Sequence, residues 1–336
     1  MQDTVIIADD LTGALDSAAP LAGPARVVVA TSVAALDRAL EHPHDILAVS
    51  TRSREIPAEQ ARARVARVLA SLPGGIRLFK KVDSRLKGNI AAELSALPDR
   101  PLLVAPAIPD FGRIVRAGQV SGFGVDTPID VAAALGGRPA TIPDTLTAED
   151  MRAALAAAAP GTILVGARGL ALALRGDQAP APVPHLDGPL TIAVGSTDPI
   201  TLEQVAALRA ARPDLVHVTA PTGVVPPPPN NAAPVTLIQM TDGPETPPAQ
   251  AAQRFAGGLA PWLDRAGTVV ITGGATAEAA LDAMGIDVMT VAGEILPGLP
   301  CCRVGPRSIV TKSGGFGTPD TFLRLAAMTE GARAHG

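Results

Sequence analysis

The chain has 336 residues, of which 47% are hydrophobic and 18% are charged. This length suits two domains of ordinary size, and the composition excludes an intrinsically disordered chain. The formal net charge of −4 and the aromatic content of 2% argue against a nucleic-acid partner, which would require a basic surface interleaved with aromatic side chains.

Predicted strands alternate with Ala- and Arg-rich helical patterns along almost the whole chain. Most of the strands are continuously apolar, which is typical of parallel strands buried on both faces. The alternation therefore predicts an α/β protein of two domains, each with a largely parallel sheet flanked by helices. The predicted strands are Val5–Asp10, Arg26–Ala30, Ile46–Thr51, Leu78–Asp83, Leu102–Ala107, Ile163–Gly166, Thr191–Gly195, Leu215–Thr219, Val235–Met240, Thr268–Thr272 and Val288–Val291.

Two proline-rich segments interrupt this pattern. Residues 176–189 lack periodicity and are typical of an interdomain linker. Residues 221–234 fall between two predicted strands and are interpreted as a surface excursion or a shortened insertion. We therefore predict a substrate-binding domain over residues 1–180 and a nucleotide-binding domain over residues 190–336, the assignment of each resting on the motifs below.

The compartment follows from the cysteines and from the apolar segments. Cys301 and Cys302 are adjacent in sequence and cannot form a disulfide framework, so we expect buried, inert thiols in a reducing compartment. The chain opens on a strand-like run without a signal peptide, and Pro160 and Gly161 break its longest apolar stretch. We expect a cytoplasmic protein with no membrane partner.

Two adjacent carboxylates end the first predicted strand. In an open α/β sheet, ligands bind beyond the carboxyl ends of the strands. Asp9 and Asp10 stand at that position and are followed by Thr12. Such a pair could hold Mg²⁺, bind substrate hydroxyls or act as a general base. Alternatively, one of the two aspartates, or Thr12, caps the following helix.

Cations follow the third, fourth and fifth predicted strands. Arg54 suits a fork-like grip on a carboxylate. The segment KKVDSRLKGN, residues 80–89, combines four cations with an aspartate and is typical of an anion-binding turn, where Gly88 would allow close backbone approach. Arg113, at the end of APAIPDFGR, could contact an acidic substrate or a phosphate. Each of these cations is also compatible with a solvated surface position.

Three glycine- and hydroxyl-rich turns mark the second half of the chain. They are GSTDP, with Asp198 as helix cap and Pro199 in the first helical position, then GGAT, and finally KSGGFG. Together they would offer backbone N–H donors to phosphates, and Lys312 would add a cation near them. The chain contains neither a P-loop nor a dinucleotide-binding fingerprint.

With these junctions in order, the chain resembles the four-carbon acid sugar kinase family, whose members phosphorylate threonate, erythronate or 3-oxo-tetronate. The resemblance covers nearly the whole chain and implies that the N-terminal domain holds the acid and the C-terminal domain holds ATP. The motifs that carry it are IIADDLTGALD, STRSRE, KKVDSRLKGNIAAEL, APAIPDFGR, VGSTDPITLEQV, ITGGATAEAAL, EILPGLP and VTKSGGFGTPDTFL.

The resemblance assigns residues to each half of the site. On the acid side it places the catalytic pair Asp9 and Asp10 with Arg54, Lys81, Asp83, Ser84 and Arg113, and the same turns add Thr12, Arg85 and Lys87. On the nucleotide side it places Ser196, Gly273, Gly274, Ala275, Thr276, Gly314 and Gly315, and the same turn adds Lys312. No metal ligand is assigned.

The chain departs from the family pattern on the substrate side. The family segment KxDSTLRGN reads KVDSRLKGN here, so that Arg85 and Lys87 replace a small hydroxyl residue and an arginine. A lysine cannot reproduce the bidentate fork of an arginine. The region after Arg113 is also shorter than in the family. Both departures bear on which acid is bound.

We therefore expect a kinase that uses ATP and Mg²⁺ to phosphorylate a hydroxyl of a small four-carbon sugar acid. Asp9 or Asp10 would accept the proton, and Arg54 with the turn from Lys81 to Lys87 would hold the carboxylate. A homodimer is common at this size. The alternatives are a non-catalytic sensor of acid sugars, a kinase for another small hydroxy acid, and an oxidoreductase or isomerase.

Overall fold

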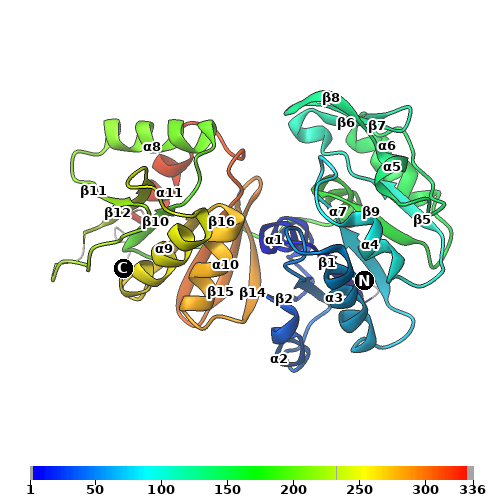
Figure 1. Cartoon of the computed structure of the whole chain (residues 1–336), viewed down its shortest axis with the longest axis horizontal. Coiled ribbons are helices and arrows are strands. Elements are labelled where there is room, and N and C mark those ends of the chain that lie inside the picture. The colour runs from blue at the N-terminus through cyan, green and yellow to red at the C-terminus, as the bar shows by residue number, and fades with distance from the viewer. Residues whose placement is uncertain (1–2, 232, 331–336) are drawn as a thin grey trace. The chain divides into compact units, whose positions relative to one another are not determined.

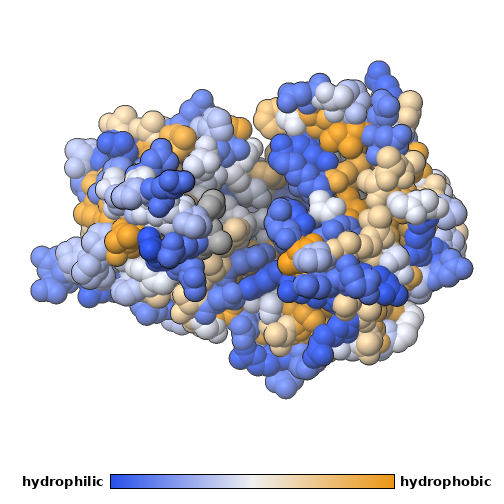
Figure 2. Space-filling view, viewed as in Figure 1, coloured by the Kyte–Doolittle hydropathy of each residue, from blue (hydrophilic) through white to orange (hydrophobic). Residues whose placement is uncertain are grey.

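The structure is a computed structural model that describes residues 3–231 and 233–330 (Figure 1). The chain divides into two compact units, Met1–Ala181 and Pro182–Gly336. Figure 2 shows hydrophilic residues and smaller apolar areas intermixed over the face that it displays. Among the described residues, no helix combines the length and the apolar character needed to cross a membrane.

Unit 1 contains a six-stranded parallel sheet in the order β2-β3-β1-β4-β9-β5. Its strands are short apolar runs that are buried almost throughout, as expected for strands covered on both faces. Ala8 pairs with both Ser50 and Lys81, so the carboxyl ends of the three central strands lie level. The strands are β1 Thr4–Ala8, β2 Val27–Ala30, β3 Ile46–Ser50, β4 Arg77–Lys81, β5 Leu102–Ala105 and β9 Ile163–Gly166.

The helices of unit 1 pack in pairs around this sheet. Helix α1 packs against α7, which also contacts α6, and α3 packs against α4. A small antiparallel sheet, β6-β7-β8, follows β5 in the chain (Figure 1). These elements are α1 Leu11–Ala18, α2 Leu36–Leu40, α3 Ala58–Ala70, α4 Ile90–Ser95, β6 Arg113–Arg116, β7 Gln119–Gly122, β8 Val125–Asp130, α5 Val131–Ala134, α6 Ala148–Ala156 and α7 Arg168–Arg175.

Unit 2 contains a seven-stranded sheet in the order β11-β12-β10-β13-β16-β15-β14. Five of these strands are parallel, while β15 runs antiparallel to both of its neighbours. The elements are β10 Leu190–Val194, α8 Pro199–Ala211, β11 Val216–Pro221, β12 Val235–Thr241, α9 Pro248–Leu263, β13 Thr268–Thr272, α10 Gly274–Ala283, β14 Val288–Leu296, β15 Leu299–Val304, β16 Arg307–Lys312 and α11 Thr321–Glu330.

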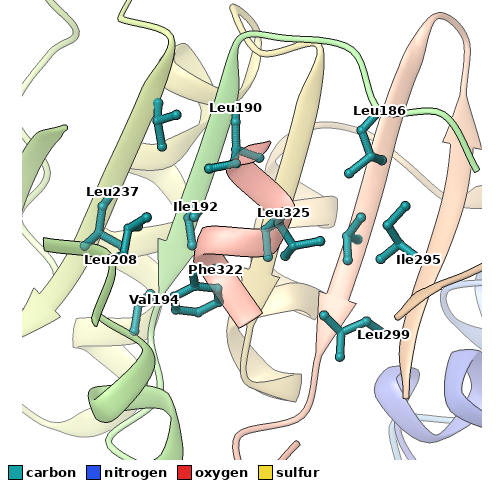
Figure 3. Close-up of a cluster of buried hydrophobic side chains, with 14 of the residues drawn as sticks. Leu186, Leu190, Ile192, Val194, Leu208, Leu237, Ile295, Leu299, Phe322 and Leu325 are labelled. Carbon is teal, nitrogen blue, oxygen red and sulfur yellow. The ribbon is translucent and has the colours of Figure 1, made fainter. Parts of the chain in front are cut away.

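The core of unit 2 forms between this sheet and the helices α8 and α11. Ile192 and Val194 of β10 cluster with Leu208 of α8 and with Phe322 and Leu325 of α11 (Figure 3). Each of these five side chains is fully buried. Because β10 and α8 are consecutive, their packing fixes the turn between them.

The single tryptophan of the chain joins the proline-rich excursion to helix α9. The indole Nε1 of Trp262 donates a hydrogen bond to the carbonyl of Pro226 at 2.8 Å, and its side chain is 6% exposed. Arg265, one turn further on, donates to the carbonyl of Pro229. The segment that the sequence marks as a surface excursion is therefore anchored to α9.

The predicted two-domain α/β class is confirmed, with differences in the strands. Strand β14 continues five residues past its predicted end, and strands β6, β7, β8, β15 and β16 were not predicted. Cys301 and Cys302 lie in β15 and are buried, as expected. Burial raises the pKa of Cys301 to about 11 and that of Cys302 well above its usual value.

Candidate functional site

In unit 1, the strand order creates a switch point between β1 and β4. From β1 the chain passes to β2 and β3 on one side, and from β4 it continues to β5 and β9 on the other. In open α/β sheets, the crevice at such a point is the usual ligand site. The predicted residues Asp9, Asp10 and Lys81 lie at this point.

Asp9 forms a buried, two-point ion pair with Arg54. The Nε of Arg54 donates to Oδ2 of Asp9 at 2.7 Å, and Nη2 donates to Oδ1 at 2.9 Å. Burial acts to raise the pKa of Asp9, but the hydrogen bonds and charge of Arg54, with the charges of Lys80 and Lys81, outweigh it and hold this pKa below its usual value. Asp9 is therefore held in its carboxylate form near neutral pH.

Asp10 caps helix α1 and shares Arg54 with Asp9. Its Oδ1 accepts from the Gly13 amide at 3.0 Å and from Nη2 of Arg54 at 2.9 Å, while its Oδ2 accepts from Thr12 Oγ1 at 2.7 Å. Asp10 is thus the N-cap of helix α1, which was one of the alternatives predicted from the sequence. The Asp10 side chain is 14% exposed, against 3% for Asp9.

The two lysines of β4 have different environments. The Nζ of Lys80 lies 3.0 Å from Oε2 of Glu93 and donates to two carbonyl oxygens, so its charge is fully engaged inside the unit. Lys81 lies on the other side of the strand. A methyl group at Gly13 would be 2.8 Å from the Nζ of Lys81 and 2.4 Å from Oδ1 of Asp10, so both groups border Gly13. The Nζ of Lys81 forms no hydrogen bond or ion pair with any described residue.

The turn after β4 presents the remaining substrate-side residues. Asp83 accepts from the backbone amide of Arg85 at 2.8 Å, and Ser84 accepts from Nη1 of Arg113 at 2.5 Å. Arg85 and Lys87 are exposed, whereas Ser84 is buried. The structure therefore brings Arg113 to this turn, although 29 residues separate it from Ser84 in the chain.

Gly88 is required where this turn passes the buried ion pair. Its φ is +94°, and a side chain there would meet Oδ2 of Asp9 at 3.1 Å and Cγ of Arg54 at 3.4 Å. Glycine is the residue that adopts this conformation without strain. The backbone approach predicted for Gly88 is thus an approach to Asp9 and Arg54.

In unit 2, the switch point lies between β10 and β13. From β10 the chain passes to β11 and β12 on one side, and from β13 it continues to β14, β15 and β16 on the other. The turns after β10 and β13 pack closely, because a methyl group at Gly195 would be 2.0 Å from Oγ1 of Thr276. Ser196 accepts from the Asp198 amide at 3.2 Å, and Asp198 caps α8 through the Ile200 amide, as predicted.

Helix α10 begins at this edge without a side-chain cap. Gly273 takes a φ of +89° as its N-cap, and Gly274, Ala275 and Thr276 form its first turn. A helix start without a capping side chain leaves backbone N–H groups for an anion. Ala275 is exposed and Gly274 is partly exposed, so that these donors can be reached from outside the unit.

Lys312 is engaged in holding the third glycine turn. Its buried Nζ donates to Oγ1 of Thr201 at 2.9 Å and to the carbonyl oxygens of Ser313 and Gly314 at 3.1 and 2.8 Å. A methyl group at Gly314 would lie 2.8 Å from Oγ of Ser196, so this turn packs against the turn after β10. The predicted nucleotide-side residues thus gather at one edge, with Gly315 exposed.

The pH dependence of stability should report the burial of Lys312. Burial, opposed by the charge of Asp198, lowers its pKa from 10.5 to about 8. Below pH 8 Lys312 is protonated in both the folded and the unfolded chain. Between pH 8 and 10.5 only the folded chain releases the proton, so this group raises the free energy of unfolding by roughly 3 kcal/mol. Denaturant titrations should show that rise in the wild type but not in Lys312→Met. If the free energy of unfolding rises equally with pH in the two proteins, this role of Lys312 is contradicted.

Sequence reasoning missed a buried network beneath the acid-side residues. Glu93 bonds Lys80, and one of its oxygens also accepts from Oγ of Ser53. The side-chain amide of Asn89 donates to the carbonyl oxygens of Ser53 and Ile56 at 2.8 and 2.7 Å. The amide residue Asn89 and the acidic residue Glu93, both in the short segment NIAAEL, were the available signal in the sequence. They connect the turn after β3 to helix α4.

The described residues contain no group of three or more His, Cys, Asp and Glu side chains arranged to hold a metal ion. A magnesium ion that is bound mainly through substrate phosphates needs only one or two carboxylates. Asp198 fits this role, since its Oδ2 is directed toward the Gly315 turn, 3.6 Å from the position of an added methyl group there.

Two family models match the chain. Residues 4–129 match a sugar-binding N-terminal domain, and residues 229–322 match a nucleotide-binding C-terminal domain. The first range contains the switch point of unit 1, and the second contains the turns after β13 and β16.

Curated relatives align over nearly the full chain. A D-threonate kinase from Cupriavidus necator is 29% identical over 97% of this chain and 98% of its own length. A 3-oxo-tetronate kinase from Burkholderia multivorans is 27% identical over 97% of each chain. A D-erythronate kinase from Heliobacterium modesticaldum is 36% identical, over 36% of this chain and 29% of its own.

Two solved structures share the fold. A Salmonella typhimurium protein described as a putative tRNA synthase superposes with a TM-score of 0.75 at 17% identity, over 96% of this chain and 98% of its own. A Haemophilus influenzae protein superposes with a TM-score of 0.68 at 20% identity, over 97% of this chain and all of its own.

Proposed function

Since the chain belongs to the four-carbon acid sugar kinase family, we propose that it transfers the γ-phosphoryl group of ATP to a hydroxyl of a threonate-, erythronate- or 3-oxo-tetronate-type acid. One observation carries the proposal. The carboxylates of Asp9 and Asp10 and the ammonium of Lys81 gather at the switch point of the unit that matches the sugar-binding model, and open glycine turns gather at that of the other unit.

On the acid side, Asp10 is the better candidate for the general base. Its carboxylate keeps contact with solvent, whereas both oxygens of Asp9 are bound by Arg54. A base must reach the hydroxyl whose proton it accepts, and Asp10 meets that condition. Asp9 and Arg54 would hold Asp10 in place, and the free ammonium of Lys81 beside it would attract the anionic reactants.

On the nucleotide side, backbone donors would bind the phosphates. The first turn of α10, from Gly274 to Thr276, and the turn at Gly314 and Gly315 would supply them, with the hydroxyl of Ser196. Lys312 would act by fixing its own turn, because its ammonium already has three partners. Asp198 would contribute a carboxylate to Mg²⁺, which neutralises charge on the transferring phosphoryl group.

A coupled assay of ADP release tests the proposal. Purified protein with Mg²⁺ and ATP would be assayed against both enantiomers of threonate and erythronate, their 3-oxo forms and glycerate. Turnover on a four-carbon acid that disappears in Asp10→Asn is expected. If no acid is turned over while ATP binds, the substrate is another acid. If ATP does not bind either, the protein is a sensor and the kinase proposal fails.

A further inference from the structure

The charge of Arg54 is already balanced by two carboxylates. Its Nε and Nη2 donate to Asp9, and Nη2 also donates to Asp10. A third carboxylate placed there would face two negative charges at close range, and like charges so arranged repel strongly. The carboxylate of an acid substrate therefore requires cations elsewhere in the unit.

Two arginines that form no ion pair with the described residues meet at the turn after β4, since Arg113 bonds Ser84, the residue before Arg85. The three donating nitrogens of Arg113 bond neutral oxygens, namely Oγ of Ser84 and the carbonyl of Phe123. The exposed side chain of Arg85 has no hydrogen bond or ion pair with any residue that the structure describes. Burial and the nearby charge of Arg85 lower the pKa of Arg113, with Asp83 opposing them, so the two cations are close enough to repel each other.

The local backbone fixes the position from which the Arg85 side chain projects. Oδ1 of Asp83 accepts from the Arg85 amide at 2.8 Å, and the Leu86 amide donates to the carbonyl of Asp83 at 2.9 Å. Leu86 takes a φ of +56°, a conformation that costs free energy in a residue other than glycine. Like charges brought close to each other are unfavourable in the free protein, and a bound anion relieves their repulsion.

We propose that Arg85 and Arg113 form a clamp for the carboxylate of the sugar acid, which makes Arg85 a specificity-determining residue. The clamp rests on the function proposed above. Guanidinium groups match a carboxylate through parallel N–H donors, and such charge-assisted bonds are about twice as strong as neutral ones. The acid would then lie with its carboxylate at this turn and its reacting hydroxyl toward Asp10.

Steady-state kinetics and calorimetry on Arg85→Ala, with Arg116→Ala as a matched control, test the clamp. Arg116 is an exposed arginine at the end of β6, the strand that begins at Arg113, so its replacement removes the same charge. We expect Arg85→Ala to raise the KM for the acid about 10- to 100-fold with kcat within about twofold, and Arg85→Lys to lie between. Calorimetric binding of the acid without ATP should weaken by a similar factor, while binding of the neutral polyol threitol should not change.

The outcomes separate the clamp from the kinase function. Turnover with an unchanged KM in Arg85→Ala, or the same change in Arg116→Ala, would overturn the clamp and leave the kinase intact. An acid that binds through Arg85 but is never phosphorylated would refute the kinase and keep the clamp. Inorganic phosphate serves as a second probe. If Arg85→Ala weakens only inhibition by phosphate, the pair recognises the phosphoryl group and the carboxylate assignment is wrong.

Discussion

Asp9→Asn is expected to lose stability and activity together, whereas Asp10→Asn should lose activity while keeping most of its stability. Replacing Asp9 removes the two-point part of a largely buried ion pair and leaves Arg54 bonded to Asp10. Breaking a buried pair costs about 3–5 kcal/mol, and the remaining charge of Asp10 should keep the loss near the lower end of that range. Asparagine can still cap α1 at position 10, so the cost there should be under about 1 kcal/mol.

Activity should separate the two aspartates as well. Removal of a general base typically lowers kcat by about 10²–10⁴-fold, and Asp10→Asn should fall in that range with the protein still folded. Urea unfolding and kcat would be measured on both variants, with Asp99→Asn as a control that removes an exposed carboxylate of unit 1 outside the candidate site. An Asp10→Asn enzyme that keeps full kcat would exclude Asp10 as the base and turn attention to Asp9.

Glu93→Ala is expected to be among the most destabilising single changes in unit 1. Lys80 is fully buried, and its ammonium would lose the carboxylate that lies 3.0 Å away. Ser53 would lose its partner as well. The expected loss is about 3–5 kcal/mol in the free energy of unfolding, because an uncompensated buried charge remains.

A double replacement checks that mechanism. Lys80→Met combined with Glu93→Leu removes both charges and keeps apolar volume, so it should recover most of the stability lost in Glu93→Ala. Denaturant midpoints of the single and double variants would be compared at one pH. If the double variant is as unstable as the single one, the loss arises from packing or from Ser53 rather than from the unpaired lysine.

The residues at the carboxyl ends of the strands in each sheet were predictable from the sequence, because the candidate functional residues come directly after the strands. Asp9 and Asp10 come at the end of a continuously apolar run, and glycine turns end the strands of the second half. Parallel strands place their carboxyl ends together, so these residues had to meet. The helix cap at Asp198 was equally predictable, since Asp198 precedes a proline at the first helical position.

Contacts between residues that lie far apart in the sequence were not predictable. Nothing adjacent to Arg113 indicates that it bonds Ser84, and nothing adjacent to Arg54 indicates that both aspartates occupy its donors. The small sheet β6-β7-β8 was missed because its short strands carry mixed polar residues, and most of these residues are partly or fully exposed. Pairing in such strands is set by turns and neighbours rather than by an apolar run.

Trp262 gives this chain a built-in optical reporter for one half of its fold. It is the sole tryptophan, the chain has no tyrosine, and the indole lies buried in unit 2 against the proline-rich segment. Fluorescence excited at tryptophan wavelengths therefore follows the local environment of unit 2, whereas far-ultraviolet circular dichroism follows both units. Denaturation curves from the two signals would separate if the units unfold independently, and would coincide if they unfold as one cooperative body.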